Sequence, residues 1–303
     1  KLLQLQQYIQ NPGSLPVLPE ANDNYMSNWE NSANGIANTN WVDFNYKPFA
    51  VRQTHNLNVS GGTKDVQYYV SGGYNNEGGI LRYADINYER YNFNTSLNAN
   101  LAKWIKASVN TKFSQSTYST PFSETFENLF FHNMLRMRPN ISPYDLAGNF
   151  NEISNVPYFE SGSENITKQN ILSISPSLKI TPAKNWNINV DFNILRTNAD
   201  NSALLLPATV YGIDGTPKLV NRSEYGIVLT GSYGRTTSTN TYVSPNIYTS
   251  YDLKIGDGHQ FTVLGGYQQE LNRFESLSGS AQDLISFATP GLGLTTSSSL
   301  ATE

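Results

Sequence analysis

Hydrophobic and polar residues alternate strictly along several segments of the chain. In residues 91–101, YNFNTSLNANL, the odd positions are apolar or Thr95, and the even positions are serine or asparagine. An α-helix would spread these two sets around its whole surface, so the alternation predicts a β-strand. A strand of eleven residues is long for a soluble sheet and matches the length that a tilted strand needs to cross a bilayer.

The same alternation recurs in pairs of segments, and each pair predicts a β-hairpin. The predicted strand pairs are 51–60 with 66–74, 91–101 with 105–113, 171–180 with 186–194, and 241–253 with 259–271. We therefore expect an all-β fold, in which antiparallel strands form a segment of a transmembrane β-barrel with long external loops and one short loop helix.

The lengths of the connections alternate as regularly as the side chains. Three to five residues join the strands of each hairpin, whereas about fifty and about forty residues separate the later hairpins, against a usual median of about four to six. Short turns at one end and long loops at the other are typical of transmembrane barrels. Residues 223–236 would break this order as a further spanning strand, so we expect them to form a strand or hairpin arm inside the long loop.

The two faces of the predicted strands indicate a lipid side and a hydrated lumen. We expect Phe93, Leu97, Val109, Ile188 and Val190 to face lipid, and Asn94, Asn98, Asn110, Asn189 and Asp191 to face the lumen. Trp104 and Trp186 each follow a short turn, where aromatic rings mark the membrane interface of a barrel. The alternative for these two residues is a buried tryptophan that closes a soluble sandwich.

Two prolines conflict with a regular ladder of hydrogen bonds. Pro176 and Pro245 lie on the apolar face of predicted strands, and a proline has no N–H to donate to a neighbouring strand. We expect a β-bulge at each position.

The long loops contain one clear helix signal and many aromatic residues. Residues 123–139, SETFENLFFHNMLRMRP, begin with Ser123 as N-cap and end at Pro139, as a helix would. We expect the loops to form an external rim that meets a partner and the substrate; the alternative is that their aromatic residues only fill the loops' own cores. The aromatic candidates are Phe122, Phe126, Phe130, Phe131, Tyr144, Tyr158, Tyr211 and Tyr225.

Composition excludes several classes of protein. The 303 residues carry a net charge of −4, and 12% are aromatic, which fits neither a disordered chain nor a basic nucleic-acid-binding protein. The absence of cysteine removes disulfides and thiolate chemistry. No apolar run is long enough for a transmembrane helix.

The sequence contains no recognisable catalytic motif. The three histidines are far apart, and no paired carboxylates, phosphate loop or nucleophile motif occurs. We therefore expect no enzyme activity, no catalytic residue, no cofactor and no metal. Residues 144–149, YDLAGN, are expected to form an Asx-type turn, with part of a calcium loop as the alternative.

Two stretches carry a resemblance to a known family. Residues 54–81, THNLNVSGGTKDVQYYVSGGYNNEGGIL, and residues 88–110, YERYNFNTSLNANLAKWIKASVN, resemble the early barrel of the SusC/RagA-type TonB-dependent transporters. The shared features are a His-Asn-Leu-x-Val-Ser-Gly-Gly strand and a Glu-Gly-Ile-Leu loop. The resemblance continues through RPNISPYDLAGNF and GDGHQFTVLGGYQQE, which are residues 138–150 and 256–270.

The resemblance implies a bacterial outer-membrane barrel that imports oligosaccharides or peptides. It further implies a plug domain, energy from the TonB complex and a SusD-like lipoprotein as partner. We find no match to the plug, and eight strands cannot enclose one, so we expect a segment of a longer protein. Within it, we expect an irregular region at 1–50, barrel hairpins at 51–272 and a further external loop from 273.

Two function classes remain open. In the first, the asparagine-rich face lines a lumen through which neutral sugars or peptides pass. In the second, the chain is a soluble or cell-surface β-sandwich or solenoid that binds glycan without moving it. Extraction would separate them, because a membrane barrel requires detergent and a sandwich does not.

Overall fold

The computed structural model describes residues 37–121, 136–139, 141–145, 147–151, 153–212, 215–220, 231–256, 258–296 and 300–302. Nearly all of the regular structure is antiparallel β-sheet, which confirms the predicted all-β fold. The elements are α3 (Trp41–Asn45), β1 (Arg52–Gly62), β2 (Val66–Gly78), β3 (Asn87–Ala102), β4 (Ile105–Pro121), α5 (Val156–Glu160), β5 (Glu164–Ala183), β6 (Trp186–Leu205), β7 (Ala208–Tyr211), β8 (Pro217–Val220), β9 (Ser232–Ile255), β10 (His259–Gln268), β11 (Leu271–Gln282) and β12 (Leu300–Thr302).

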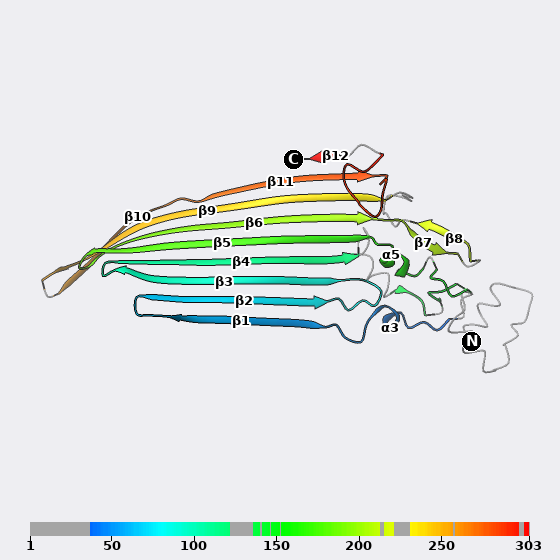
Figure 1. Ribbon diagram of the computed structural model, residues 1–303, viewed down its shortest axis with the longest axis horizontal. Helices are drawn as coiled ribbons and strands as arrows, with labels where there is room; N and C mark the ends of the chain where they lie inside the picture. The colour runs from blue at the N-terminus through cyan, green and yellow to red at the C-terminus, as the bar shows by residue number, and fades with distance from the viewer. Residues whose placement is uncertain are drawn as a thin grey trace, which may run out of the picture.

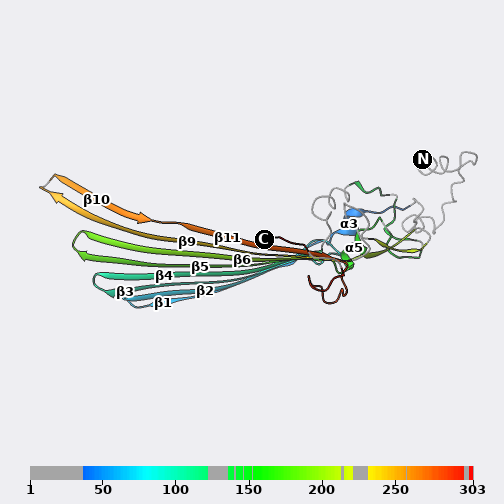
Figure 2. The ribbon, with the colours of Figure 1, turned by 90° about the horizontal axis from the view of Figure 1, so that it is seen from above.

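One ten-stranded sheet organises the molecule. Its strands follow the order β1-β2-β3-β4-β5-β6-β9-β11-β12, and β10 also pairs with β9. The short turns lie together at one end of the strands, while the long connections, with α3, α5 and the small β7–β8 hairpin, lie at the other (Figure 1). We call these the turn end and the loop end. Seen from above, the strands fan apart towards the turn end, which reflects the twist of the sheet (Figure 2).

The four predicted hairpins are all present, and most of their strands, though not β1, extend further towards the loop end than the alternation indicated. Strand β3 continues beyond residues 91–101 to Asn87, and β11 continues to Gln282. The expected boundary of an external loop at 273 therefore falls inside a paired strand. The expectation for residues 223–236 needs a similar correction, because Ser232 already begins β9 and residues 223–230 lie outside the described part.

The expected β-bulges at the two prolines are wrong. The register between β5 and β6 is the same at Ile174 and at Ser177, on either side of Pro176, and between them the pairing of Ser175 and Pro176 with β6 is missing. The register shifts only closer to the turn, between Ile180 and Ala183. The second proline, Pro245, faces Phe192 on β6, and on its other side a two-residue gap separates β10 from β11 without a change of register. Each ladder thus lacks a few hydrogen bonds near the proline, and neither strand contains the extra residue that would make a β-bulge.

Tight turns close the hairpins at positions that require unusual backbone angles. Gly62 has a φ of +146°, and a Cβ atom there would lie 2.1 Å from the carbonyl oxygen of Val66. In the β5–β6 turn Asn185 has a φ of 70°, a conformation that asparagine tolerates better than most residues. Because these residues adopt a positive φ, the chain can reverse direction within a short turn, which fixes the register of the two strands.

The hydrophobic core lies at the loop end and not along the sheet. The buried hydrophobic residues are Ala37, Trp41, Leu81, Ala84, Val156, Leu204, Leu205, Ala208, Val210, Ala281 and Leu284. They belong to the connections or to the loop-side ends of strands. Among them Leu81 and Ala84 form a cluster against which Tyr46, Ile86 and Phe159 pack.

The helices are short. In the part of the chain that the structure describes, no helix has the length and apolar character needed to cross a membrane. The helix expected at 123–139 falls largely on residues 122–135, which lie outside the described ranges. Asn40 caps α3, since its side chain accepts hydrogen bonds from the backbone amides of Val42 and Asp43.

Candidate functional site

The register of the strands collects apolar side chains on one face of the sheet. Leu97 on β3 lies opposite Val109 on β4, and Val109 lies opposite Pro176 on β5. Residues directly opposite each other point to the same face. Leu97 is 43% exposed, and Phe93, on the same face of β3, is 46% exposed. We call this the apolar face; soluble monomers rarely expose a continuous apolar surface of this extent.

The apolar face covers the strands from β1 to β11. Its exposed large side chains include Leu57, Val59, Val66, Tyr68, Val70, Phe93, Leu97, Phe192, Ile247, Val263 and Leu271. The predicted lipid-facing residues Ile188 and Val190 lie in the same alternation on β6, opposite Ile180 and Leu178. All five residues that the sequence assigned to lipid therefore share one face.

The opposite face is polar, and we call it the polar face. Asn94 faces Ser71 and Lys112, and its side-chain amide donates to the Ser71 hydroxyl at 3.2 Å. Asn98 faces Gln67 and Ser108 in the same way. The remaining three predicted lumen residues continue this face: Asn110 faces Ser96, Asn189 faces Lys179, and Asp191 faces Ser177.

Asp191 is the acidic member of the predicted lumen set. Its carboxylate accepts a hydrogen bond of 2.6 Å from the Ser177 hydroxyl, which keeps the negative charge partnered on the polar face. That face can therefore offer hydroxyl, amide and a few charged groups to a solute.

Aromatic residues mark the turn-side edge of the apolar face. Trp186 is the first residue of β6, is 39% exposed, and donates through its ring N–H to the Thr249 hydroxyl at 2.8 Å. Trp104 lies in the β3–β4 turn and is 52% exposed. Both positions suit rings at a membrane interface; that role stays a prediction.

A second aromatic group lies at the loop-side edge and was missed in the sequence. The hydroxyls of Tyr74 and Tyr91 both donate to one carboxylate oxygen of Glu89, at 3.0 and 2.9 Å, and their ring centroids are 5.0 Å apart. From Tyr91 to Leu101 a strand rises about 33 Å, or about 25 Å at a barrel tilt near 40°. The apolar face between the two aromatic edges thus matches the apolar band of a membrane barrel.

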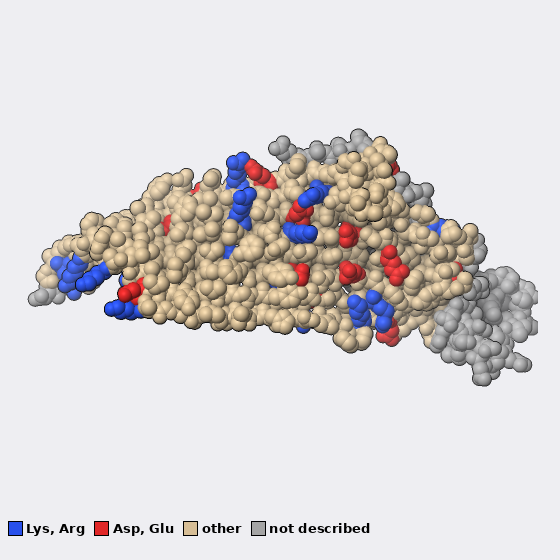
Figure 3. All heavy atoms as spheres, viewed as in Figure 1, with Lys and Arg blue, Asp and Glu red and all other residues tan. Residues whose placement is uncertain are grey.

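Charged side chains are distributed in agreement with this band. On the face presented in Figure 3, mainly lysine and arginine with some acidic side chains lie at the turn end, and charges of both signs lie towards the loop end. The stretch between them over β1–β5 carries almost none. A surface in contact with lipid requires such a gap, because charge at the bilayer midplane costs about 2–4 kcal/mol.

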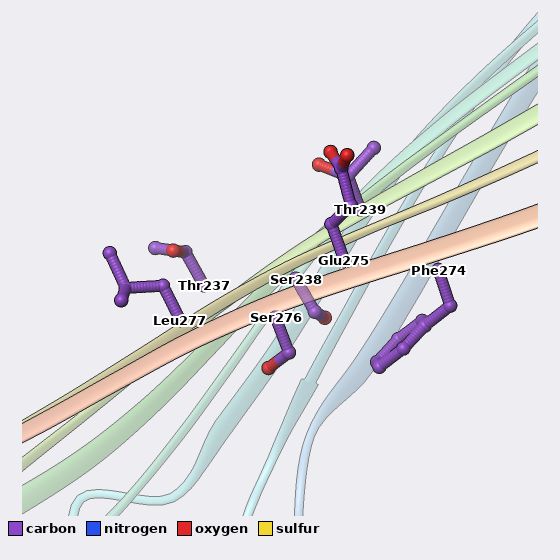
Figure 4. A pocket seen from close by; sticks show the side chains of 7 residues that line it. All are labelled: Thr237, Ser238, Thr239, Phe274, Glu275, Ser276 and Leu277. Atoms are coloured by element: carbon purple, nitrogen blue, oxygen red, sulfur yellow. The ribbon is translucent and has the colours of Figure 1, made fainter. Parts of the chain in front are cut away.

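A hollow between β9 and β11 is not an enclosed site. Its lining includes Thr237, Ser238, Ser276 and Leu277. Figure 4 shows Thr237 and Leu277 on one side of the two strands and Ser238 and Ser276 on the other. Side chains that diverge in this way do not converge on a ligand, and we assign no binding role to them.

At the loop end, aromatic rings from three separate connections pack together. Phe44 contacts Tyr83, Tyr144 and Phe150, with ring centroids 5.2, 6.0 and 6.3 Å away. Trp41 completes this loop cluster, 5.5 Å from Phe44. Burial raises the pKa of the Tyr144 hydroxyl, and the neighbouring Tyr83 adds to the shift.

The hydrogen bonds of Asp145 with Ala147 and Asn149 are those of the Asx-type turn that the sequence predicts. One carboxylate oxygen of Asp145 accepts from the backbone amides of Ala147 and Asn149, and the other accepts from the Asn149 side chain. Burial alone would raise the pKa of Asp145, but these bonds and the backbone amide of Gly148 together hold it below its ordinary value. Among the described residues, no group of three acidic or histidine side chains is arranged to hold a metal ion.

The structure brings together some of the aromatic rim candidates. Tyr144 belongs to the loop cluster, and Tyr211 in β7 donates its backbone amide to the Phe150 carbonyl at 3.3 Å. Tyr158 lies in α5 and is half-buried. The other candidates, Phe122, Phe126, Phe130, Phe131 and Tyr225, lie outside the described residues.

Comparisons with known proteins agree with the fold. No family model matches the chain. The chain is 25% identical over 251 residues to the TonB-dependent receptor SusC of Bacteroides thetaiotaomicron, an alignment that covers 79% of this chain and 25% of that protein. The chain thus spans about a quarter of this curated relative.

Solved structures of the RagAB system share the fold. The structure of the RagAB peptide transporter matches with a TM-score of 0.69 and 17% identity over 88% of this chain and 29% of its own. The RagAB peptide importer in the "open-open" state matches with a TM-score of 0.71 and 16% identity over 99% and 35%. The predicted resemblance to a SusC/RagA-type barrel is confirmed, over part of the length of these relatives.

Proposed function

We propose that this segment of a SusC/RagA-type barrel belongs to a TonB-dependent importer in the bacterial outer membrane. The observation that carries the proposal is the exposed apolar face, which extends across the sheet and is backed by a polar face. In a closed barrel every strand pairs with its neighbours, so the backbone hydrogen bonds are satisfied within the membrane. The apolar face then contacts lipid, and the polar face contacts water.

The alternative, a soluble sandwich or solenoid, requires a second layer over the apolar face. In the described part of the chain, the buried hydrophobic residues lie at the loop end, while Leu57 and Leu97 remain 75% and 43% exposed. Covering that face with lipid explains the pattern without a further protein layer.

The polar face supports a lumen for neutral or weakly charged solutes. Its side chains are mostly asparagine and serine, which donate and accept hydrogen bonds without a strong electrostatic preference. Oligosaccharides and peptides are solutes of this type, and the relatives include a protein named as a peptide transporter. Passage through such a lumen requires binding and release, so we infer no enzymatic step.

The long loops are the proposed site of recognition. They lie at one end of the strands and pack together through the loop cluster. We infer that this packed region forms a surface at the external mouth. We propose that this surface docks a SusD-like lipoprotein and meets the substrate, and that a plug region outside this chain contacts the TonB complex.

Two measurements on the producing bacterium test the proposal. The protein should remain in the outer-membrane fraction until detergent is added, and a deletion strain should lose growth on a particular peptide or glycan as sole source. Extraction by salt alone would contradict the membrane assignment. Unchanged growth on every peptide and glycan tested would contradict import.

The sequence placed this loop at 117–168, but β4 ends at Pro121 and β5 begins at Glu164. Replacing residues 122–163 by a four-residue turn therefore tests the loop separately from the strands. We expect the shortened protein to insert in the membrane, lose co-purification of the lipoprotein and lose uptake. Unchanged co-purification and uptake, with normal insertion, would remove recognition from this loop.

A further inference from the structure

Three lysines gather on the polar face at the turn end of the sheet. Lys64, Lys106 and Lys179 line one hollow of about 390 Å³, together with Asp65 and several asparagine and serine side chains. The hollow therefore carries three positive charges and one negative charge.

Two of these lysines are direct neighbours across the ladder. Lys106 on β4 lies opposite Lys179 on β5. Like charges directly opposite each other on neighbouring strands destabilise a sheet. The pair therefore lowers the stability of the empty sheet, and an anion placed between the two ammonium groups would relieve the repulsion.

Neither lysine of the pair forms an ion pair with an acidic side chain in the described ranges, and Asp65, the acid that lines the hollow, pairs with neither. The ion pairs there are Arg52–Glu77, Arg235–Asp200 and Arg273–Glu275. The nearest acid in the register, Asp191, lies opposite Ser177 and accepts its hydroxyl hydrogen bond, whereas Lys179 lies opposite Asn189. The ammonium groups are thus available to a ligand.

The rest of the hollow can hydrogen-bond a polar ligand. Asn98 and Ser108, which face each other on β3 and β4, both line it. The floor is fixed by Asn100, whose backbone amide donates to the Asp65 carbonyl at 2.7 Å and whose side chain donates to the Lys64 carbonyl at 2.9 Å. These bonds hold the β1–β2 turn, which carries Lys64, against β3, while Lys106 and Lys179 are held by the strands β4 and β5.

We propose that this hollow binds a carboxylate of the transported molecule close to the turn end of the lumen. The inference rests on the proposed function, because it takes the polar face as the lumen. A carboxylate accepts charge-assisted hydrogen bonds from both ammonium groups, and the neighbouring amide and hydroxyl groups can bind the backbone of a peptide or the hydroxyls of a sugar acid.

The test compares the double variant Lys106→Gln/Lys179→Gln with the original full-length protein in detergent at low salt. The probes are a glutamate-containing peptide with its glutamine counterpart, and an acidic oligosaccharide with its neutral counterpart. Binding of at least one acidic probe should weaken about five- to tenfold, as expected for two solvent-accessible lysines. Neutral probes should bind unchanged, and the acidic probe that responds identifies the source of the carboxylate.

Lys112→Gln is the matched control, because Lys112 lies on the same face of β4 as Asn110 but outside the hollow. It should leave all probes unaffected. An equal loss in this control, or equal binding of the acidic probes to the double variant, would overturn the proposal.

Thermal unfolding without ligand tests whether a carboxylate of the same protein already binds the two lysines. Removing two like charges should leave the melting temperature unchanged or raise it. A lower melting temperature would assign the lysines to a carboxylate elsewhere in the same protein and overturn the proposal. A protein that needs no detergent would instead contradict the proposed function, whatever the binding result.

Discussion

In the middle of the sheet Phe93 and Leu97 are 46% and 43% exposed, whereas at the loop end Val156 and Val210 are completely buried. The two regions use similar side chains in opposite ways. The sheet holds its shape through long backbone ladders and leaves its apolar face exposed. The loop end builds its own core from connections far apart in the chain, as a protein region in water must. Substitutions should therefore have opposite consequences in the two regions.

The largest difference is expected between neighbouring residues of one strand. Val109→Arg places a charge on the apolar face and should cost about 2–4 kcal/mol of unfolding free energy in lipid bilayers. Asn110→Arg, one residue further on the polar face, should cost less than about 1 kcal/mol, since its charge stays in water. Reversible unfolding by urea in vesicles measures both. Equal costs would mean that the two faces do not meet different solvents.

At the loop end, Asp145→Ala should destabilise the turn at 144–149. The change removes the acceptor for three hydrogen bonds and leaves donors unpaired, at a cost of about 1–3 kcal/mol. Hydrogen exchange of the peptide covering these residues should accelerate, while exchange in β3 and β4 should not change. Faster exchange in both regions would show that the loop end and the sheet unfold together.

The same turn should weaken in acid. The pKa of Asp145 is lowered in the folded protein, so its contribution is complete above the pKa of an unfolded aspartate and is lost as pH falls through the lower folded value. Exchange at the turn, corrected for intrinsic rates, should therefore rise below about pH 4. Asp145→Asn should remove this dependence; a variant that keeps it would place its origin in another group.

The smallest effect is expected at the interface. Trp186→Phe keeps an aromatic ring but removes the N–H that donates to Thr249, which should cost about 0.5–1.5 kcal/mol. Trp186→Ala should cost more, because the ring itself is lost from the membrane interface. If the phenylalanine and alanine variants lose the same unfolding free energy, the hydrogen bond to Thr249 stabilises this part of the sheet and the ring does not.

The sequence predicted the sheet well because a strand's faces are encoded locally. Alternation alone was enough to place Leu97 and Val109 on one face and Asn94 on the other, and the short turns determined the pairing. The outer ends of the strands were not predictable in this way, since Ser278 and Ser280 on β11 follow no hydrophobic alternation and are held by pairing with β9.

The loop end could not be predicted because its contacts join distant residues. Trp41, Tyr83 and Tyr144 come from three connections, and no local pattern links them. Tyr144 was a candidate for its aromatic ring alone, and its role in the cluster depends on Phe44, more than ninety residues away. The two prolines were misjudged for a related reason, because neighbouring strands accommodate them by omitting pairs.

The most direct test of the two-faced sheet is cysteine labelling at two adjacent positions of β3. Single variants Phe93→Cys and Asn94→Cys, in a chain that has no other cysteine, are exposed in intact outer membranes to a lipid-soluble and to a water-soluble thiol reagent. We expect Cys at position 93 to react with the lipid-soluble reagent and Cys at position 94 with the water-soluble one. Equal labelling of both positions by either reagent would contradict the assignment of one face to lipid and the other to the lumen.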